Sequence, residues 1–208
     1  MKKNLDIRTL ETAKEAPDNP YELFNDWFTQ AEEYEDIYPN AMCLATCTKD
    51  GRPSARIVLL KDHDERGFVF YTNKQSNKGE QLAITPFAAL TFHWKTLELQ
   101  IRIEGAIEHV SDTEADTYFK TRHPGSRIGA WASQQSRELA SRTELSDRVK
   151  AAEEQYKDND DIPRPPHWSG YRVVPDKIEF WHEGAHRLHT RLVYAKDGIN
   201  WSKTMLNP

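Results

Sequence analysis

The spacing of hydrophobic residues changes from a helical to an alternating pattern near residue 40. Between residues 23 and 31, apolar side chains recur about every three to four positions, which is typical of a helix with one buried face. Asn19 and Glu22 are spaced as a capping box at its start, and Pro20 suits the first turn. Residues 1–18 are polar and lack periodicity, so we interpret them as a mobile N-terminal arm. Residues 19–208 are expected to form a single domain.

After residue 40, short apolar runs are separated by turn residues, which indicates strands joined by hairpins. Ser76, Ser111 and Ser141 each precede a predicted helix, and a short helical turn is expected at 128–131, after a break at 123–126. Strands are predicted at residues 41–48, 53–62, 68–72, 87–94, 97–107, 171–174, 177–181, 187–195 and 199–203. Many short strands with a few helices between them predict an α+β fold, a small, mainly antiparallel barrel with flanking helices.

Charge and composition exclude several classes of protein. The 208 residues include 28 Lys and Arg and 33 Asp and Glu, a balance that does not suit a general nucleic-acid binder. No apolar run approaches the length of a membrane span, and the first residues lack the apolar core of a secretion signal. Cys43 and Cys47 are interpreted as reduced, buried thiols. These features predict a cytoplasmic protein that binds neither nucleic acid nor a membrane.

The run at residues 54–61 places a cation near each end of a predicted central, buried strand. Arg56 and Lys61 are unusual there, because charged side chains seldom enter such runs unless an anion lies against them. Their odd spacing predicts that they point to opposite faces, which suits two anionic groups or the two ends of one long ligand. Alternatively, both cations lie at the strand ends and reach water along their stems.

A second group of cations occurs at Arg187, His189 and Arg191. On a strand these side chains share one face, which is unfavourable unless an anion or an electron-rich ring lies opposite. An exposed edge strand tolerates the same row of cations, and the spacing does not separate the two interpretations.

Three histidines have the spacing of a zinc-binding helix. His182, His186 and His189 would line one face of such a helix, but Gly184 and the alternating pattern favour a strand and turn. The three side chains would not converge there, so no metal site is predicted.

Two polar segments could contact a ligand. Ser76 to Gly79 joins a strand to a helix start, where backbone N–H groups and Lys78 could hold a phosphate, although many helix starts look like this. Gln135 and Ser136 either bind a ligand amide or form a simple loop. Spacing alone favours a core role for Trp168. No Gly-x-Gly-x-x-Gly sequence or Walker loop supports a dinucleotide-binding or P-loop protein.

Several short motifs follow one another in a specific order along the chain. They are Arg56-Ile57-Val58-Leu59-Leu60-Lys61, Phe70-Tyr71-Thr72-Asn73, Ser76-x-Lys78-Gly79, Ile128-Gly129-Ala130-Trp131, Gln135-Ser136, Glu179-Phe180-Trp181 and Arg187-Leu188-His189-x-Arg191. Their order and spacing resemble the pyridoxamine 5′-phosphate oxidase family from about residue 19 to the C-terminus. The resemblance implies a split β-barrel homodimer with flavin mononucleotide (FMN) at the subunit interface. It also implies FMN-dependent oxidation of pyridoxamine or pyridoxine 5′-phosphate to pyridoxal 5′-phosphate, with O2 as electron acceptor and H2O2 as product.

The resemblance also implies the residues of the site. The FMN contacts would be Arg56, Ile57, Val58, Leu59, Leu60, Lys61, Tyr71, Thr72, Lys78, Gln100, Gln135, Ser136, Trp181 and Arg191. The substrate contacts would be Lys61, Tyr118, Arg122, Ser126, Arg187 and His189. Arg187 and His189 would be the catalytic residues, flanking the substrate ring and balancing charge. An FMN phosphate would suit Arg56 and Lys78, and the substrate phosphate would suit the cluster around Arg122.

Three other functions are compatible with these residues. One is a related FMN-dependent oxidase that acts on another small ring, such as a phenazine precursor. Another is an FMN-binding or pyridoxal-phosphate-binding protein without turnover. The third is a structural barrel that binds no flavin.

Overall fold

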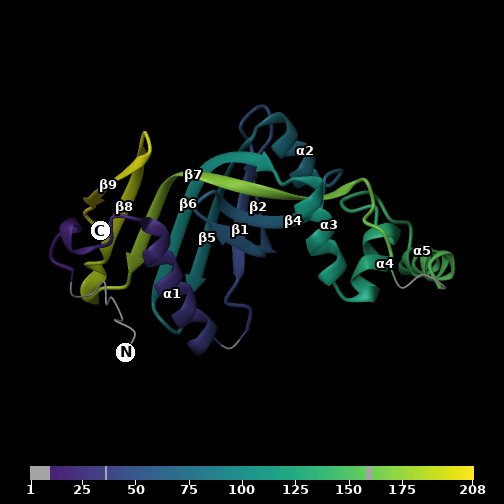
Figure 1. The fold of residues 1–208 in the computed structure, drawn as a ribbon, viewed down its shortest axis with the longest axis horizontal. Coiled ribbons are helices and arrows are strands. Elements are labelled where there is room, and N and C mark those ends of the chain that lie inside the picture. Colours follow the sequence, from purple (N-terminus) through teal and green to yellow (C-terminus); the bar gives the residue numbers. More distant parts are fainter. Residues whose placement is uncertain (1–9, 36, 158–160) are drawn as a thin grey trace.

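The structure is a computed structural model that describes residues 10–35, 37–157 and 161–208. Within these residues, nine strands, all paired antiparallel, form one curled sheet, and five α-helices surround it (Figure 1). The strands are β1 (Ala41–Cys47), β2 (Pro53–Leu59), β3 (Asp62–Asp64), β4 (Gly67–Asn73), β5 (Phe87–Trp94), β6 (Leu99–His109), β7 (Trp168–His182), β8 (Thr190–Asp197) and β9 (Asn200–Met205). The helices are α1 (Pro20–Tyr34), α2 (Asn77–Ile84), α3 (Asp112–Thr121), α4 (Pro124–Ala132) and α5 (Arg142–Gln155), with short 3-10 turns η2 (Ala13–Glu15) and η3 (Ala185–Arg187). The α+β, mainly antiparallel fold class is therefore confirmed.

Strand β7 organises the sheet because it changes its pairing partner half-way along. On one side it pairs with β6, while on the other its first half pairs with β4 and its second half with β8. The sequence predicted two separate strands, at 171–174 and 177–181, but β7 is continuous through both. Pro175 is tolerated because it lies at the change of partner, opposite a bulge between Glu104 and Gly105.

Strand β2 lies at an edge of the sheet and pairs with β1. The prediction of a central, buried strand at residues 54–61 is therefore wrong. The side chain of Ile57 is 66% exposed, and the strand ends at Leu59, before the short β3. A run of apolar β-formers is compatible with both positions in a sheet, since it records residue type and not the number of neighbouring strands.

Helix α1 packs against the sheet and forms the main core with it (Figure 1). Asn19 caps the helix and Pro20 occupies its first turn, as predicted. The predicted capping box with Glu22 is not formed, because the side chain of Asn19 accepts from the backbone N–H of Tyr21, the second helical residue, and a capping box uses the third. Phe24 is fully buried and contacts the rings of Phe68 and Phe92 edge to face.

The described part of the predicted N-terminal arm lies against the C-terminal hairpin. The hydroxyl of Tyr194 donates to the carbonyl of Pro17, and Lys203 Nζ donates to the carbonyl of Ala16 and to Asp18. Residues 1–9, including Arg8, lie outside the described residues. The mobile arm and the single domain therefore stay predictions.

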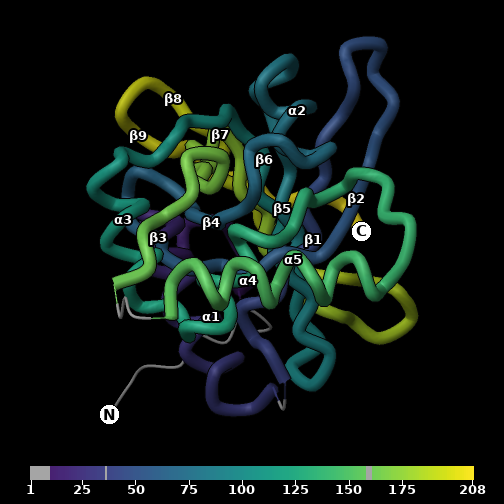
Figure 2. The backbone as a smooth tube through the Cα atoms, turned by 90° about the vertical axis from the view of Figure 1, so that its right-hand side faces the viewer, coloured from purple at the N-terminus to yellow at the C-terminus, as the bar shows by residue number. Residues whose placement is uncertain are grey.

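Helices α3, α4 and α5 lie together at the end of the sheet where β7 begins (Figures 1 and 2). Ser111 and Glu114 form the predicted capping box of α3. The expected break at 123–126 is instead the start of α4, because the ring of His123 accepts from the backbone N–H of Gly125 and Pro124 suits the first helical position.

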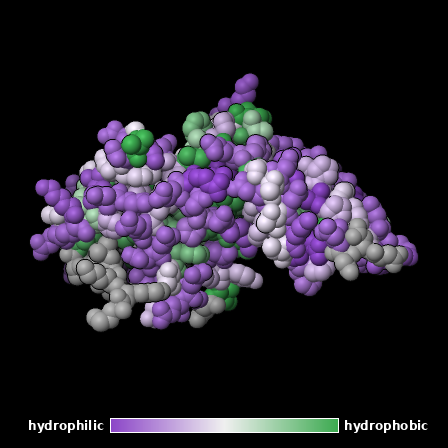
Figure 3. All heavy atoms as spheres, in the orientation of Figure 1, coloured by the Kyte–Doolittle hydropathy of each residue, from purple (hydrophilic) through white to green (hydrophobic). Residues whose placement is uncertain are grey.

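The surface drawn in Figure 3 is mainly hydrophilic, with small hydrophobic groups that lie apart from one another. None of the helices in the described segments combines the length and the apolar character that crossing a membrane requires.

Candidate functional site

A cavity of about 520 Å³ lies beside the beginning of β7, between the edge strand β2 and helices α3 and α4. It brings together residues that the sequence assigned to the flavin and residues that it assigned to the substrate. These are Arg56, Ile57, Val58, Leu59, Lys61, Tyr71, Thr72, Lys78, Tyr118, Arg122, Ser126 and Gln135. His123 and Trp168 also line the cavity, and neither was predicted as a site residue.

The cavity is strongly positive. Four permanent cations line it, and none of the described residues in its lining is Asp or Glu. Arg56 donates to the hydroxyls of Thr46 (2.6 Å) and Ser54 (2.6 Å), which are neutral acceptors. Burial and the nearby Arg56 lower the pKa of Lys78, and burial lowers the pKa of Arg56. Uncompensated cations of this kind favour an anionic ligand.

Arg56 and Lys61 both line this cavity, although the sequence predicted that they point to opposite faces of one strand. The alternation of side chains holds only within a strand, and β2 ends at Leu59. Beyond that point the backbone N–H of Lys61 donates to the carbonyl of Val69 on β4, which turns the chain toward the cavity. The side chain of Leu60 is 4% exposed and belongs to the main core, away from the cavity.

Three aromatic rings form a stack in the cavity wall. The ring of Tyr71 lies 4.2 Å from that of Tyr118 and 5.1 Å from that of Trp168, nearly parallel to both. Gly170 is the cross-strand neighbour of Tyr71, and a Cβ atom there would lie 2.6 Å from the Tyr71 ring. Burial raises the pKa of Tyr71 to about 12, so its hydroxyl is a neutral donor at physiological pH. We call Tyr118, Tyr71 and Trp168 the aromatic stack.

Arg122 lies against two rings. Its guanidinium carbon is 4.8 Å from the centre of the Trp168 ring and 5.3 Å from that of Phe119. Its Nη1 atom is buried and has no hydrogen-bond partner among the described residues. Burial lowers the pKa of this guanidinium. A buried, unsatisfied donor on a charged group is costly, and an oxygen of a bound phosphate would satisfy it.

The remaining predicted flavin residues lie near the other end of β7. Gln100, Trp181 and Arg191 are in register across β6, β7 and β8. Arg191 Nε donates to Glu179 Oε1 at 2.7 Å, and this bond raises the pKa of Arg191. Trp168 and Trp181 are the first and the last but one residues of β7. Strand geometry therefore allows up to about 40 Å between them.

Arg187 and His189 are not on a strand, so the predicted row of three cations is wrong. Arg187 is the last residue of the turn η3 and has a left-handed backbone (φ 65°). His186, the residue before it, also has a left-handed backbone (φ 56°). His189 lies beyond it, with Nδ1 accepting from the backbone N–H of Gly184 and its ring 4.6 Å from that of Trp181. Non-glycine residues in this conformation are strained and occur often at functional sites.

Two other predicted features are less informative. Ser76 caps α2 as expected, and Ser136 follows Gln135 in an exposed loop with a left-handed backbone (φ 67°). Among the described residues, no group of three His, Cys, Asp or Glu side chains could hold a metal ion.

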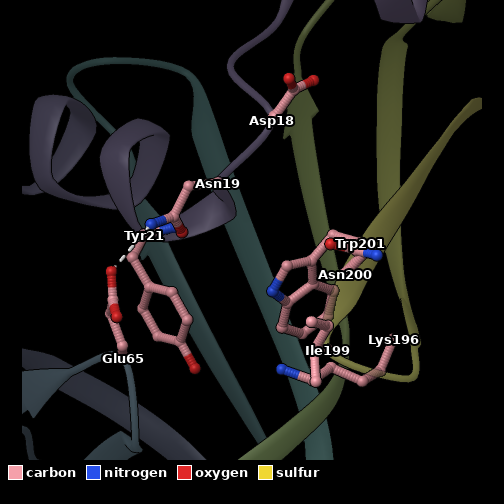
Figure 4. A pocket seen from close by; sticks show the side chains of 8 residues that line it. All are labelled: Asp18, Asn19, Tyr21, Glu65, Lys196, Ile199, Asn200 and Trp201. Atoms are coloured by element: carbon pink, nitrogen blue, oxygen red, sulfur yellow. Dashed lines mark hydrogen bonds between the residues drawn. The ribbon is translucent and has the colours of Figure 1, made fainter.

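A second cavity, of about 550 Å³, lies between the start of α1 and the β8–β9 hairpin (Figure 4). Tyr21 and Trp201 face each other across it, while Asn19 donates to Glu65. Its lining contains two carboxylates beside a single lysine, Lys196, and none of the predicted site residues. It therefore lacks the uncompensated positive charge of the first cavity.

Comparisons with known proteins agree with this arrangement. Residues 30–156 match the sequence model of the family described as pyridoxamine 5′-phosphate oxidase. Residues 168–208 match that of the pyridoxine 5′-phosphate oxidase C-terminal dimerisation region. This chain belongs to the pyridoxamine 5′-phosphate oxidase family.

Similar members of the family include the pyridoxine/pyridoxamine 5′-phosphate oxidases of Gloeothece citriformis and Myxococcus xanthus. The first is 53% identical and the match covers 100% of this chain and 97% of the relative. The second is also 53% identical, over 92% of this chain and 93% of the relative. The family predicted from the motifs is thus confirmed, and with it the prediction of an oxidoreductase of pyridoxine metabolism.

Solved structures confirm the predicted split-barrel fold. PhzG from Burkholderia lata 383, in complex with tetrahydrophenazine-1-carboxylic acid, superposes with a TM-score of 0.89 at 33% identity, covering 96% of this chain and 97% of that one. A pyridoxamine 5′-phosphate oxidase-related, FMN binding protein from Nostoc punctiforme has a TM-score of 0.73 at 16% identity, covering 93% and 100%. The second likeness concerns the fold alone.

Proposed function

We propose that this chain is a cytoplasmic, FMN-dependent oxidase that converts pyridoxamine or pyridoxine 5′-phosphate to pyridoxal 5′-phosphate, with O2 as acceptor and H2O2 as product. The main support is the cavity beside β7, where four cations lie without any carboxylate among the described lining residues. The unsatisfied Nη1 of Arg122 agrees with this, since it lacks only an anionic acceptor. Membership of the family supplies the class of reaction.

The donors in the cavity fit two phosphorylated molecules. Arg56 and Lys78 lie close enough to influence each other electrostatically, beside the start of α2, and would hold the phosphate of FMN. Lys61 lies near Tyr118, with its Nζ 6.0 Å from the ring centre, and Arg122 and Ser126 complete a second group that would hold the substrate phosphate. Two separate groups of donors are what two phosphates require.

FMN, when bound, supplies the redox chemistry, and the residues of this chain place the substrate and stabilise charge. Tyr118 and Ser126 offer hydroxyl donors, and Arg122 offers paired N–H donors that match a phosphate. His189 Nδ1 accepts a backbone N–H, so the neutral ring carries its proton on Nε2 and can donate from that atom. Arg187 would balance negative charge on the substrate ring or its electron acceptor.

We further propose that two copies of the chain complete each site. The cavity residues and the group of Gln100, Trp181, Arg191 and His189 lie at opposite ends of β7, a strand long enough to separate them by up to about 40 Å within one protomer. The matched dimerisation region includes β7 and the whole C-terminal hairpin. A homodimer would bring the C-terminal group of one copy to the cavity of the other.

The test is a visible spectrum and an oxygen-uptake assay on the purified protein. We expect flavin absorbance bands after loading with FMN, bleaching on anaerobic addition of pyridoxamine 5′-phosphate, and O2 consumption on exposure to air. Arg187→Leu should slow the bleaching without abolishing FMN binding. A protein that binds no FMN, or binds it and is not reduced by either phosphorylated vitamer, would contradict the proposal.

One alternative has a specific observation in its favour. The likeness to PhzG, whose structure contains tetrahydrophenazine-1-carboxylic acid, supports an oxidase that acts on a phosphate-free ring. The cluster of Lys61, Tyr118, Arg122 and Ser126 favours the phosphorylated substrate, because a dianion uses more of these donors than a carboxylate does. Faster turnover of tetrahydrophenazine-1-carboxylic acid than of pyridoxine 5′-phosphate would favour the alternative.

A further inference from the structure

Trp168 links the aromatic stack to the arginine that would bind the substrate phosphate. Its indole is 6% exposed, stacks on Tyr71 and packs edge to face against Phe119 at 5.0 Å. The guanidinium carbon of Arg122 lies 4.8 Å from the centre of the same indole. No family motif from the sequence contains this residue, and the sequence treated it as part of the core.

Three other arginines in the described residues, outside the cavity, are held by carboxylates. Arg164 donates to Asp112 and Asp116, Arg172 donates to Glu114, and Arg191 donates to Glu179. A carboxylate fixes a guanidinium but also occupies its N–H donors and cancels its charge. Arg122 has ring faces in place of a carboxylate.

Ring faces hold a cation without using its hydrogen-bond donors. The attraction comes from the negative face of the aromatic ring and increases when the pair is shielded from water. The N–H groups at the edge of the guanidinium then stay available, in agreement with the buried Nη1 that has no hydrogen-bond partner among the described residues. An arginine held in this way keeps its full positive charge for a ligand.

The position of Trp168 is itself fixed relative to Arg122. Its backbone carbonyl accepts from Arg164 Nη1 at 2.8 Å, and the same guanidinium donates to Asp112 and Asp116 of α3. Helix α3 ends at Thr121, directly before Arg122. Arg164 therefore ties the first residue of β7 to the helix that carries Arg122, so the indole and the guanidinium are held as one unit.

We propose that Trp168 is a positioning residue that holds Arg122 for the phosphate of the substrate, and that selectivity for phosphorylated over phosphate-free substrates depends on its ring. This inference rests on the proposed function, since it concerns the same site. Trp168 acts through Arg122 and takes no part in the redox step.

Two substitutions separate the ring face from simple bulk. Trp168→Met keeps an apolar side chain but loses the ring, whereas Trp168→Phe keeps a smaller ring. Trp131→Met is the matched control, because Trp131 packs on Tyr156 and His167 and its indole N–H donates to Pro163, with no contact to Arg122. The readouts are calorimetric affinities of the FMN-loaded proteins for pyridoxal 5′-phosphate and for pyridoxal, with kcat and KM for pyridoxine 5′-phosphate.

We expect Trp168→Met to weaken binding of pyridoxal 5′-phosphate about tenfold, the size of a shielded cation–π contact. Binding of pyridoxal and of FMN should change less than about twofold, KM should rise, and kcat should be retained within about twofold. Trp168→Phe should recover most of the affinity, and Trp131→Met should resemble the wild type. Equal loss for pyridoxal and its phosphate, or equal loss in the Met and Phe variants, would show a purely structural role and overturn the proposal.

A measurement on the unmodified protein keeps the inference testable if Trp168→Met does not fold. Ring currents should shift the side-chain resonances of Arg122 upfield in NMR spectra, and inorganic phosphate should move them further. Arg122 side-chain resonances that are not shifted upfield and do not change when inorganic phosphate is added would refute the role of Trp168. A wild type that neither binds FMN nor oxidises the vitamers, yet shows the phosphate response, would instead refute the proposed function and leave the role of Trp168 at an anion site intact.

Discussion

The two ends of β7 differ in whether their cationic side chains are paired with carboxylates. At the end that begins with Trp168, Arg56, Lys78 and Arg122 face a cavity without carboxylates among the described lining residues, and burial lowers their pKa values. At the other end, Glu179 accepts from Arg191 and also from Arg102, and its hydrogen bond raises the pKa of Arg191.

This difference distinguishes cations that serve a ligand from cations that serve the fold. A cation with its own carboxylate is neutralised whether or not a ligand is present. The ion pair holds the side chain in place and leaves little net charge to attract a ligand. A buried cation without one destabilises the free protein and gains most when an anion arrives. The absence of carboxylates among the described lining residues, together with the direction of the pKa shifts, therefore indicates which end of β7 is better suited to an anion.

The largest effect should follow removal of an uncompensated cation. Arg122→Leu is expected to lower kcat/KM for pyridoxine 5′-phosphate about 100-fold, or about 3 kcal/mol, because a charge-assisted contact with phosphate is lost. The free energy of unfolding of the ligand-free protein should stay the same or rise slightly, since a buried charge has been removed. Steady-state kinetics measure the fall in kcat/KM, and urea unfolding measures the free energy of unfolding. A large fall in stability with unchanged kinetics would remove the distinction between the two ends.

The opposite result is expected at the C-terminal end. Glu179→Gln leaves Arg102 and Arg191 without their shared carboxylate and should destabilise the protein by about 2 kcal/mol, a value reduced because both arginines are partly exposed. Urea unfolding measures the loss. Glu104→Gln is the matched control, because Glu104 also pairs with Arg102 but is 36% exposed, and it should cost less than about 0.5 kcal/mol. Equal costs in the two variants would contradict the proposed role of burial.

A carboxylate introduced into the cavity should pair with a cation there, as Glu179 does at the C-terminal end of β7. Lys78 Nζ donates to Gln135 Oε1 at 3.4 Å, so Gln135→Glu places a negative charge beside a lysine that faces no carboxylate in the described lining of the cavity. We expect FMN to bind about tenfold more weakly, or about 1.4 kcal/mol, while the ligand-free protein gains up to about 0.5 kcal/mol. Flavin fluorescence titration and thermal unfolding of the ligand-free form test this. Tighter FMN binding would mean that Lys78 does not contact its phosphate.

The smallest effect concerns a carboxylate that supports the cavity from outside. Hydrogen bonding to the backbone of Ser111, and then to Arg172, lowers the pKa of Glu114 from 4.5 to about 2. Because the folded-state pKa is depressed, the stabilisation is complete above pH 4.5 and is lost as the pH falls toward 2. Glu114→Gln should cost about 1 kcal/mol at pH 7, after allowance for solvent screening, and almost nothing at pH 2. Urea unfolding at both values decides, and a cost that is equal at pH 7 and pH 2 would exclude this linkage.

Features set by neighbouring residues could be predicted from the sequence. The caps at Asn19, Ser76, Ser111 and Ser141 depend on a few adjacent residues, and all four side chains accept a backbone N–H group, although Asn19 does so without the predicted capping box. The alternating pattern also located β5 correctly at Phe87–Trp94. Most of the predicted cavity residues were assigned through the resemblance to the family, which rests on the order of the motifs. The structure brings these residues together in one cavity.

Features set by distant pairing could not be predicted. The edge position of β2 depends on which strand lies beside it, and the continuity of β7 through Pro175 depends on where its neighbours β4 and β8 meet it. The left-handed backbone at Arg187 has no signal in an arginine, since glycine or asparagine usually marks such a position. Trp168 was missed because a tryptophan is common in cores. The one signal is Gly170 two positions later, whose missing side chain makes room for a neighbouring ring.

The anchoring of residues 16–18 by the C-terminal hairpin has a consequence for the order of folding. Lys203 and Tyr194 are 187 and 177 positions away from the residues they hold, Ala16 and Pro17. A ribosome makes the N-terminal segment first, yet these contacts cannot form until β8 and β9 have been made. Closing so long a loop is slow, so residues 16–18 should be among the last parts of the described chain to become protected from protease or hydrogen exchange.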